Sequence, residues 1–266
     1  MTDATGARVG DLLRSWRRRR HLTQLDLSAR TGVSTRHLSY VETGRSRPTR
    51  TMIERLAAEL EIPLRERNEL LLAAGLAPAY PERGLDAPEL LAVSGALQTI
   101  LDAHLPFPAL LLDRWWNVVD RNAATDVLLA GCAAHLLEPP VNAVLLTLHP
   151  EGLAPRIVNL GQWRAHLLAQ VRSRAARTGD PRLHRLADRA ASLPGEDAGR
   201  AARADVVVPL ELETDGGVLR FFSISTAVES AADVTVDELR LEAFYPADEA
   251  TRRTMRTAAE VTASRS

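Results

Sequence analysis

The sequence has one cysteine, Cys132, no lysine, and few aromatic residues, which make up 4% of the chain. A single cysteine excludes an internal disulfide and a cysteine-based zinc cluster. No apolar run approaches the roughly 18–20 residues that a membrane-spanning helix needs, and the first residues lack the apolar core of a signal peptide. The sequence therefore predicts a cytoplasmic protein with no membrane partner. The absence of lysine among the 33 basic residues indicates a GC-rich genome rather than a function.

Charge is distributed unevenly along the chain, although the total nearly cancels. The 266 residues include 33 basic and 34 acidic side chains. Residues 1–80 hold 14 arginines and nine acidic side chains, and the remainder holds 19 basic and 25 acidic ones. A basic N-terminal part on an acidic body is typical of phosphate binding at the N-terminus. The length is sufficient for one large domain or two ordinary ones.

Signals of catalysis are weak. Cys132 and His135 are three residues apart, but Cys132 lies in an apolar helix end without a basic neighbour to lower its pKa. His135, His149 and His166 lack the spacing of a metal site, and no glycine-rich loop could hold a phosphate. The sequence therefore predicts a protein that is not an enzyme and has neither a metal nor a cofactor.

The stretch from Thr23 to Gly44 contains two short helical patterns around a tight turn at Gly32-Val33-Ser34. Ser34 suits the N-cap of the second helix, since its hydroxyl can accept a hydrogen bond from a free backbone N–H of the first turn. Leu38 and Val41, three residues apart, bury one side of that helix. The opposite side carries side chains that can hydrogen-bond: Thr35, Arg36, Ser39 and Tyr40. A helix with such an outer face is suited to the major groove of DNA.

These residues form the pattern TQxxLSxxxGVSxxxLSxxExG, which is very similar to the helix-turn-helix of the XRE and phage-repressor group. The resemblance implies a DNA surface made of Gln24, Thr35, Arg36, Ser39 and Tyr40. Gln24 would clamp a phosphate at a helix N-terminus and support a base contact. Arg36 would bind a guanine with two hydrogen bonds, and Tyr40 would touch a thymine methyl or a phosphate. The alternative is that these side chains are only the solvent-exposed residues of a surface helix and do not contact DNA.

Two further features surround this motif. In the repressor family an arginine of the first helix pairs with the glutamate before the turn that follows the recognition helix. These positions match Arg17 and Glu42, so the resemblance implies a partly buried Arg17–Glu42 pair. Arg17 also opens a four-residue basic run to Arg20, for which a solvated helix end is the alternative. The loop after Gly44 carries arginines that would contact the DNA backbone: Arg45, Arg47 and Arg50.

Helical periodicity continues on both sides of the motif. The expected helices are Val9–Arg20, the two helices of the motif, Thr51–Leu60 and Pro63–Ala74. They predict a multidomain protein that begins with a compact all-α, five-helix, lambda-repressor-like domain over residues 1–77. Residues 78–105 are predicted to form a linker followed by a connecting helix from about Pro88 to His104.

The pattern of apolar and polar residues changes after Pro106. Residues 109–122 have the pattern of a strand, a turn at Asp113-Arg114 and a second strand, after which Asn122 would cap a helix over Ala123–Ala130. PAS-type sensor domains begin in this way, so we expect an α/β PAS-like domain over residues 106–266. The remaining expected elements are helices at Pro140–Leu148, Asn159–Arg177, Pro181–Ser192 and after Pro246, a loop at Leu193–Arg203, strands at Asp205–Leu212, Val218–Ala227 and Leu239–Tyr245, and a hairpin turn at Gly216-Gly217.

The second half is also similar to the MmyB-like ligand-binding domain. The resemblance lies in DRWWNVVDRNAA, LHPEGLAPRIVNL, QWRAHLL, GDPRL and LEAFYPADEATRRTMR. In actinobacterial and related regulators this domain directly follows an XRE-type helix-turn-helix. The resemblance implies a sequence-specific transcription regulator with a small apolar effector, for which a fatty-acid-like ligand is the precedent. The candidate ligand contacts are Trp116, Asn122, His149, Arg156, Asn159, Trp163 and Phe222; His149 before Pro150 has a structural cap as its alternative role.

One departure from the family affects the effector. Many members have an arginine between the asparagine and the LHP block, whereas Asn142 to His149 reads NAVLLTLH here. If that arginine holds an acidic effector, this chain has another effector or none. The alternative function is a DNA-binding protein whose C-terminal domain is only a dimerisation or protein-interaction module. In either case a single domain of this kind buries little surface on DNA, so we expect a homodimer that reads two half-sites on a double-stranded operator.

Overall fold

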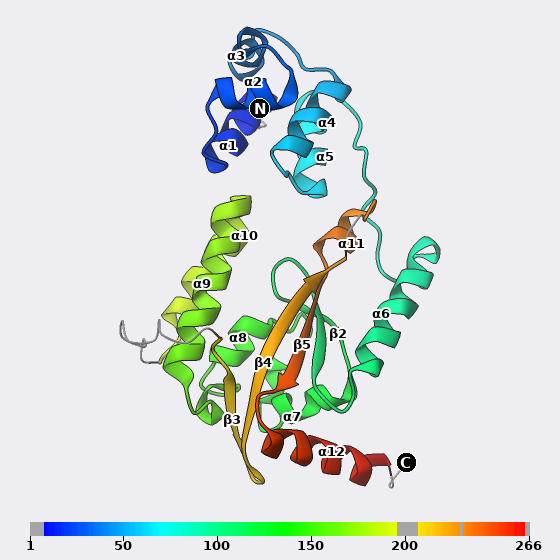
Figure 1. Cartoon of the computed structure of the whole chain (residues 1–266), viewed down its shortest axis with the longest axis vertical. Coiled ribbons are helices and arrows are strands. Elements are labelled where there is room, and N and C mark those ends of the chain that lie inside the picture. Colours follow the sequence, from blue (N-terminus) through cyan, green and yellow to red (C-terminus); the bar gives the residue numbers. More distant parts are fainter. Residues whose placement is uncertain (1–7, 196–206, 229–230, 264–266) are drawn as a thin grey trace. The chain divides into compact units, whose positions relative to one another are not determined.

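The computed structural model describes residues 8–195, 207–228 and 231–263 (Figure 1). The chain divides into two compact units. The first unit comprises residues 1–84 together with 229–237, and the second unit comprises residues 85–228 and 238–266. The first unit therefore contains two segments of the chain, and the second segment begins some 145 residues after the first one ends.

Residues 8–84 of the first unit form five α-helices (Figure 1). They are α1 (Val9–Arg19), α2 (Gln24–Thr31), α3 (Thr35–Glu42), α4 (Arg50–Glu59) and α5 (Leu64–Ala73). Their buried core consists of Leu13, Trp16, Leu27, Leu38, Val41, Ile53, Leu56, Ala57, Leu60, Ile62, Leu70 and Leu71. The apolar positions recur at helical spacing, so each helix buries one stripe against the others.

Local chemistry fixes where α2 and α3 begin and how close α1 approaches them. Thr23 and Asp26 form a reciprocal capping box at the start of α2. The Ser34 hydroxyl accepts a hydrogen bond from the backbone N–H of His37 at the start of α3. Gly32, between the two helices, has a φ of 68°, in the left-handed region that glycine tolerates best. Gly10 of α1 lies against α3, where an added Cβ would be 2.3 Å from the Val41 carbonyl oxygen.

A segment of the chain between two strands of the second unit completes the first unit. We call residues 231–237 the return segment; it includes most of α11 (Val234–Glu238). The Asp233 carboxylate lies 3.1 Å from Arg83 Nη1 and is buried. The backbone N–H of Val234 donates to the Pro81 carbonyl at 2.8 Å, and Asp237 Oδ2 accepts from the backbone N–H of Leu64. The return segment is therefore tied to the first turn of α5 and to the chain that follows α5.

The second unit contains a five-stranded sheet in the order β2-β1-β5-β4-β3, with every neighbouring pair antiparallel (Figure 1). The strands are β1 (Ala109–Leu112), β2 (Val118–Arg121), β3 (Leu210–Thr214), β4 (Gly217–Ala227) and β5 (Arg240–Pro246). The predicted fold class, an all-α domain followed by an α/β PAS-like domain, is confirmed.

The helices of the second unit cover both faces of this sheet. They are η1 (Pro88–Leu90), α6 (Leu91–Ala103), η2 (Ala123–Thr125), α7 (Asp126–Leu129), η3 (Ala134–Leu136), α8 (Ala143–Leu148), η4 (Ala154–Arg156), α9 (Leu160–Thr178), α10 (Pro181–Ser192) and α12 (Glu249–Ala263). The larger core joins one face of the sheet to α7, α8, α9 and α10. On the other face, Leu97 and Leu101 of α6 pack against Leu111 and Leu239.

Several element boundaries differ from the sequence expectation. Asn122 does not cap the following helix, because its side chain bonds instead to the backbone of Ala109, Leu101 and Phe107; the expected Ala123–Ala130 helix is split into η2 and α7. The hairpin turn is Asp215-Gly216, one residue before the expected pair. Strand β3 begins at Leu210 rather than at residue 205. The expected loop after Leu193 and the start of the expected strand lie mostly outside the described residues.

Candidate functional site

Helix α3 has one buried side and one exposed side. Leu38, Val41 and Glu42 are buried, while Arg36 and His37 are exposed. The exposed side carries a cluster of aromatic and cationic groups: Arg36 Nε donates to the Tyr40 hydroxyl at 3.1 Å, and the Arg36 and Arg45 guanidinium carbons lie 5.4 and 6.0 Å from the Tyr40 ring. The outer side of α3 is therefore a preformed surface of hydrogen-bonding and cationic groups.

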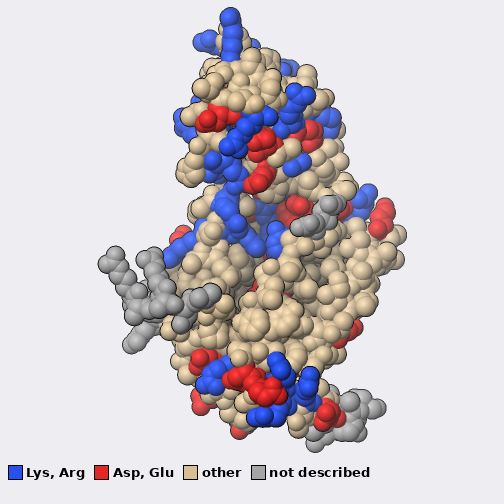
Figure 2. Space-filling view, in the orientation of Figure 1, with Lys and Arg blue, Asp and Glu red and all other residues tan. Residues whose placement is uncertain are grey.

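The other predicted DNA contacts are placed as follows. Thr35 and Ser39 are half-buried on α3, and Arg47 is exposed in the loop that follows. Gln24, at the first position of α2, donates from Nε2 to Glu42 Oε2 at 2.8 Å. Arg50 is exposed, and its Nη2 donates to the Ala77 carbonyl at 2.8 Å. In the face seen in Figure 2, arginine side chains are spread over the first unit with acidic side chains among them.

Beneath α3, Glu42 connects three helices. Arg17 binds it with two hydrogen bonds, Nε to Oε1 at 2.7 Å and Nη2 to Oε2 at 2.8 Å, and both residues are buried. Arg14 Nη2 donates to the Glu42 carbonyl at 2.6 Å. Burial alone would raise the pKa of the Glu42 carboxyl, but the hydrogen bonds from Arg17 and Gln24 and the charges of Arg17 and Arg14 outweigh it and lower that pKa. The Arg17–Glu42 pair thus locks α3 to α1, and Gln24 extends it to α2.

The rest of the basic run has mostly structural contacts. Arg20 donates from Nε to the Leu60 carbonyl at 2.8 Å and from Nη2 to the Glu61 carbonyl at 2.9 Å. The Arg19 guanidinium carbon lies 4.8 Å from the Trp16 ring centroid. Arg18 is exposed. Arg17 and Arg20 therefore tie α1 to its neighbours, whereas Arg19 lies against Trp16 of α1 itself.

The second unit encloses a small apolar cavity of about 70 Å³. Its walls come from β1, β5, α7, α8 and α9, and most of its lining is aliphatic or aromatic, including Leu110, Trp116, Leu146, Trp163 and Phe244. Trp116 has a φ of 64°, which L-residues of this size adopt rarely. The turn that holds it is fixed by Asp113, whose Oδ1 accepts from the backbone N–H groups of Trp115 and Asn117.

Two polar groups accompany this lining. Trp163 Nε1 is buried and has no hydrogen-bond partner within the part of the chain that the structure describes. Glu242 is the one charged side chain among the described residues that line the cavity. Burial raises the pKa of Glu242, against the hydrogen bonds of Ser223 and Ser225 and the charge of Arg174. Arg174 itself lies 4.1 Å from the Trp116 ring, and burial together with neighbouring arginines lowers its pKa to about 10.

The structure brings only some of the predicted ligand contacts to this cavity. Trp116 and Trp163 line it. The lining does not include the other five, which are Asn122, His149, Arg156, Asn159 and Phe222. Asn122 and Asn159 bond to backbone groups, Arg156 donates to the carbonyls of Val127 and Leu128, His149 Nδ1 accepts from the Glu151 backbone, and Phe222 stacks on Tyr245.

Sequence reasoning missed Glu242, although a signal for it was present. Alternation along β5 places Glu242 on the same face as Phe244, so a carboxylate stands on an apolar face. A charged residue in such a position is uncommon unless it is paired or functional. Cys132 does have a basic neighbour, Arg156, which the sequence did not indicate; burial outweighs it and raises the pKa of the thiol. No group of three or more metal-ligating side chains is found in residues 8–195, 207–228 and 231–263, and no described helix is long and apolar enough to span a bilayer.

Comparison with known proteins follows the same division of the chain. Residues 93–258 match the family model of the MmyB-like transcription regulator ligand binding domain, and residues 13–67 match that of the helix-turn-helix. Over 81 residues the chain is 38% identical to an uncharacterized HTH-type transcriptional regulator, RghRB, of Bacillus subtilis (strain 168). That alignment covers 30% of this chain and 56% of the relative, so the chain spans little more than half the length of that protein.

Proposed function

The chain belongs to the MmyB-like transcription regulator ligand binding domain family and carries a helix-turn-helix ahead of that domain; we propose that it reads one DNA sequence through α3 and senses a small apolar molecule in its second unit. The proposed domains are residues 1–77 for DNA binding, 78–105 as linker and connecting helix, and 106–266 for the effector. The observation that carries this proposal is the exposed side of α3, where Arg36 and Tyr40 lie on a helix whose other side is fixed by Glu42.

On DNA, α3 enters the major groove with its capped N-terminus first. Arg36 then exchanges its bond to Tyr40 for two hydrogen bonds to a guanine, which discriminate against another base by roughly 1–3 kcal/mol. Arg45 and Arg47 bind phosphates on either side. Arg50 contacts a phosphate only after it releases the Ala77 carbonyl. Gln24 acts mainly through Glu42, because its amide nitrogen is already bonded there.

The DNA claim is tested by retention of genomic fragments on the purified full chain. We expect one enriched motif with two half-sites about one helical turn (~34 Å) apart, or a multiple of that, because the protein binds as a dimer. The variant Arg36→Ala/Tyr40→Ala should lose that motif while it still retains DNA weakly through phosphates. Enrichment of the same motif by the variant would contradict the role of α3.

The effector proposal follows from the cavity. Its 70 Å³ holds about two waters, whereas sites for drug-sized ligands measure roughly 300–1,000 Å³, so the effector is small or separates the walls on entry. A carboxylate among these side chains would stand next to Glu242, and two carboxyl groups at one site cannot both be charged without mutual repulsion. A fatty-acid-like effector therefore fits best with its carboxylate outside the lining. A neutral apolar molecule with one acceptor for Trp163 Nε1 suits the lining better.

The return segment offers a physical route between effector and DNA binding. In the sequence the return segment lies between β4, which ends at Ala227, and β5, which begins at Arg240 and carries Glu242 and Phe244 of the cavity wall. A shift of β5 on effector binding would therefore act on the contacts of Asp233, Val234 and Asp237 in the first unit. The effector shifts the equilibrium only if it binds one arrangement better than the other.

The effector claim is tested by native mass spectrometry of the full chain as purified, followed by organic extraction. A stoichiometric apolar adduct would support a sensor. Absence of any adduct, together with operator binding that no extracted apolar molecule alters, would favour a second unit that serves only dimerisation or protein interaction.

A further inference from the structure

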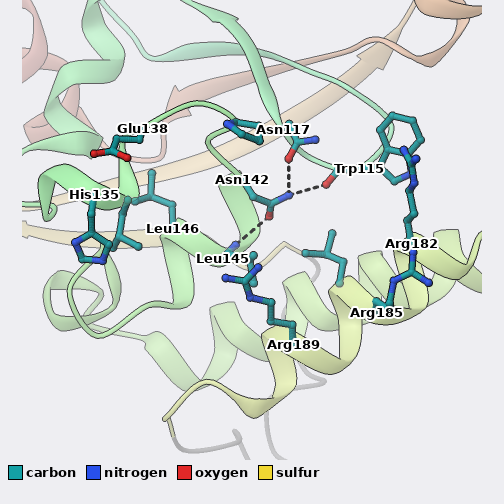
Figure 3. Close-up of a pocket in the computed structure, with 13 residues that line it drawn as sticks. Trp115, Asn117, His135, Glu138, Asn142, Leu145, Leu146, Arg182, Arg185 and Arg189 are labelled. Carbon is teal, nitrogen blue, oxygen red and sulfur yellow. Dashed lines mark hydrogen bonds between the residues drawn. The ribbon is translucent and has the colours of Figure 1, made fainter.

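A second, larger hollow lies on the second unit, outside the apolar cavity. It has a volume of about 580 Å³ and runs between α10 and the segment that leads into α8 (Figure 3). We call it the arginine groove, because Arg182, Arg185 and Arg189 of α10 line one side of it. The facing side carries His135, Glu138 and Asn142, as the close-up in Figure 3 shows. Leu146 of α8 lines both this groove and the apolar cavity.

The three arginines lie on one side of α10, since they are spaced three and four residues apart. All three are exposed. Among the described residues, no carboxylate lies within 4 Å of the guanidinium of Arg185 or Arg189. The buried Arg114 of the same unit, by contrast, lies 2.6 Å from Glu238 and 3.4 Å from Asp180.

The charge of the groove is not balanced from the facing side. Glu138 is the one carboxylate among the described residues of the lining, where three cations face it. His135 is 3.9 Å from Glu151, which lies outside the lining. Like charges three and four residues apart on a helix repel each other, and an anion bound between them relieves that repulsion.

One end of the groove is held in place before any ligand binds. The Arg182 guanidinium lies 4.7 Å from the Trp115 ring, and Trp115 Nε1 donates to Asp180 Oδ2 at 2.8 Å. Asn142 Nδ2 donates to the Trp115 carbonyl at 2.7 Å and to Asn117 Oδ1 at 3.1 Å. The Trp115 indole N–H and the Asn142 amide are therefore already satisfied. Arg182 is held by its ring contact, and the guanidinium groups of Arg185 and Arg189 have no hydrogen-bond partner among the described residues.

The remaining wall of the groove is apolar. Leu145, Leu186 and Trp115 are among the residues that line it. Guanidinium forks match the oxygens of carboxylates and phosphates, while such walls cover an apolar body. A volume of about 580 Å³ lies within the range of small-molecule sites.

We propose that the arginine groove binds a small organic anion with an apolar body, such as an aryl or short-chain phosphate ester or carboxylate. The anionic group lies between Arg185 and Arg189, and the apolar body lies against Leu145, Leu186 and Trp115. This site is separate from the proposed effector cavity, and it does not depend on the DNA-binding proposal.

The test is isothermal titration of the full chain at low salt with phenyl phosphate. Benzoate in a second arm distinguishes a carboxylate from a phosphate ester, and phenol and inorganic phosphate present each half of the ligand alone. We expect saturable binding of phenyl phosphate or benzoate. Phenol and inorganic phosphate should bind more weakly by about tenfold or more, because each of them makes only part of the contacts.

Matched variants locate the binding. R185Q/R189Q should weaken it about tenfold or more, whereas R172Q/R177Q, which removes two exposed arginines of α9 outside the groove, should change it by less than about twofold. R185K/R189K keeps the charge but loses the planar fork, so part of the affinity should remain. Equal effects of the two Gln pairs, or no saturable binding of either organic anion, would overturn the proposal.

Discussion

Glu42 accepts hydrogen bonds from Arg17 of α1 and Gln24 of α2 while it sits at the end of α3. Glu42→Gln would leave the buried Arg17 charge without a counter-charge. We expect the free energy of unfolding of the first unit to fall by about 3–5 kcal/mol, the usual loss when one partner of a buried pair is removed. Glu59→Gln is the control, because its pair with Arg30 is partly exposed to solvent and contributes about 0–1 kcal/mol.

The pH dependence of this effect has a definite sign. The pKa of Glu42 is lowered in the folded state, so its stabilisation is present above the ordinary carboxyl pKa and disappears as pH falls through the folded value. The difference in unfolding free energy between wild type and Glu42→Gln, measured by urea denaturation, should therefore begin to shrink below about pH 4.3, the ordinary glutamate pKa, and continue to shrink as pH falls further. A constant difference from pH 7 to pH 3 would contradict the assignment.

Glu242 has the opposite dependence. Burial raises its pKa in the folded state, so the unfolded chain loses this proton at lower pH than the folded chain does. The wild type should therefore lose stability as pH rises above the ordinary glutamate value, and Glu242→Gln should remove that loss. Urea midpoints at pH 5 and pH 8 measure it, with the exposed Glu213→Gln as control. Parallel pH profiles for wild type and Glu242→Gln would show that the carboxyl is not buried in this way.

How well the sequence predicted single residues depended on whether a motif specified them. The resemblance to the repressor family implied the pairing of Arg17 with Glu42, and the structure contains this pair. Asn122 and Asn159 looked like ligand contacts, yet they bond to backbone groups that lie far away in the chain. Polarity alone cannot distinguish these two uses of an asparagine, because the partner is set by tertiary packing.

At the scale of elements, the approach of α1 to α3 depends on Gly10. Gly10→Ala would place a methyl group 2.3 Å from the Val41 carbonyl oxygen, so α1 must shift. We expect a loss of about 1–3 kcal/mol in the free energy of unfolding, measured by urea denaturation. Gly95→Ala in α6 is the control, since nothing lies within 4 Å of an added Cβ; it should stabilise by roughly 0.5–1 kcal/mol. Equal stabilities for Gly10→Ala and wild type would mean that the two helices are not in this contact.

The return segment makes a second prediction for an element. Asp233→Ala removes the ion pair with Arg83 and the bond from the Thr235 backbone N–H. Hydrogen exchange in residues 231–238 should become faster, because the Val234 N–H would lose its stable bond to Pro81. Asp188→Ala, an exposed change on α10, should leave these residues protected. Unchanged exchange in Asp233→Ala would remove the return segment as a route between the units.

Element positions followed from local signals where those signals were complete. The cap at Ser34 and the glycine turn at Gly32 fixed the limits of α2 and α3 as expected. The five-stranded order, however, pairs β1 with β5 across more than 120 residues, which periodicity cannot specify. The shifted hairpin turn shows the same limit, since either of two glycine dipeptides could have formed it.

For the whole molecule, composition and motif predicted an all-α unit ahead of an α/β unit. They could not predict that residues 229–237 belong to the first unit, because that depends on contacts between segments some 150 residues apart. The arginine groove was equally hidden, since its sides come from α10 and from residues 135–146. Both features arise only when the chain folds.

Among all the elements of the molecule, we expect α3 to read the DNA sequence. Competition titrations of the full chain against operator variants that differ by single base pairs test it directly, with Arg47→Ala as the comparison. Arg36→Ala should abolish a preference of roughly 1–3 kcal/mol at one base pair and leave the others, whereas Arg47→Ala should weaken all operators alike and flatten the salt dependence. If Arg36→Ala leaves the ratios of affinities unchanged, α3 does not read the sequence.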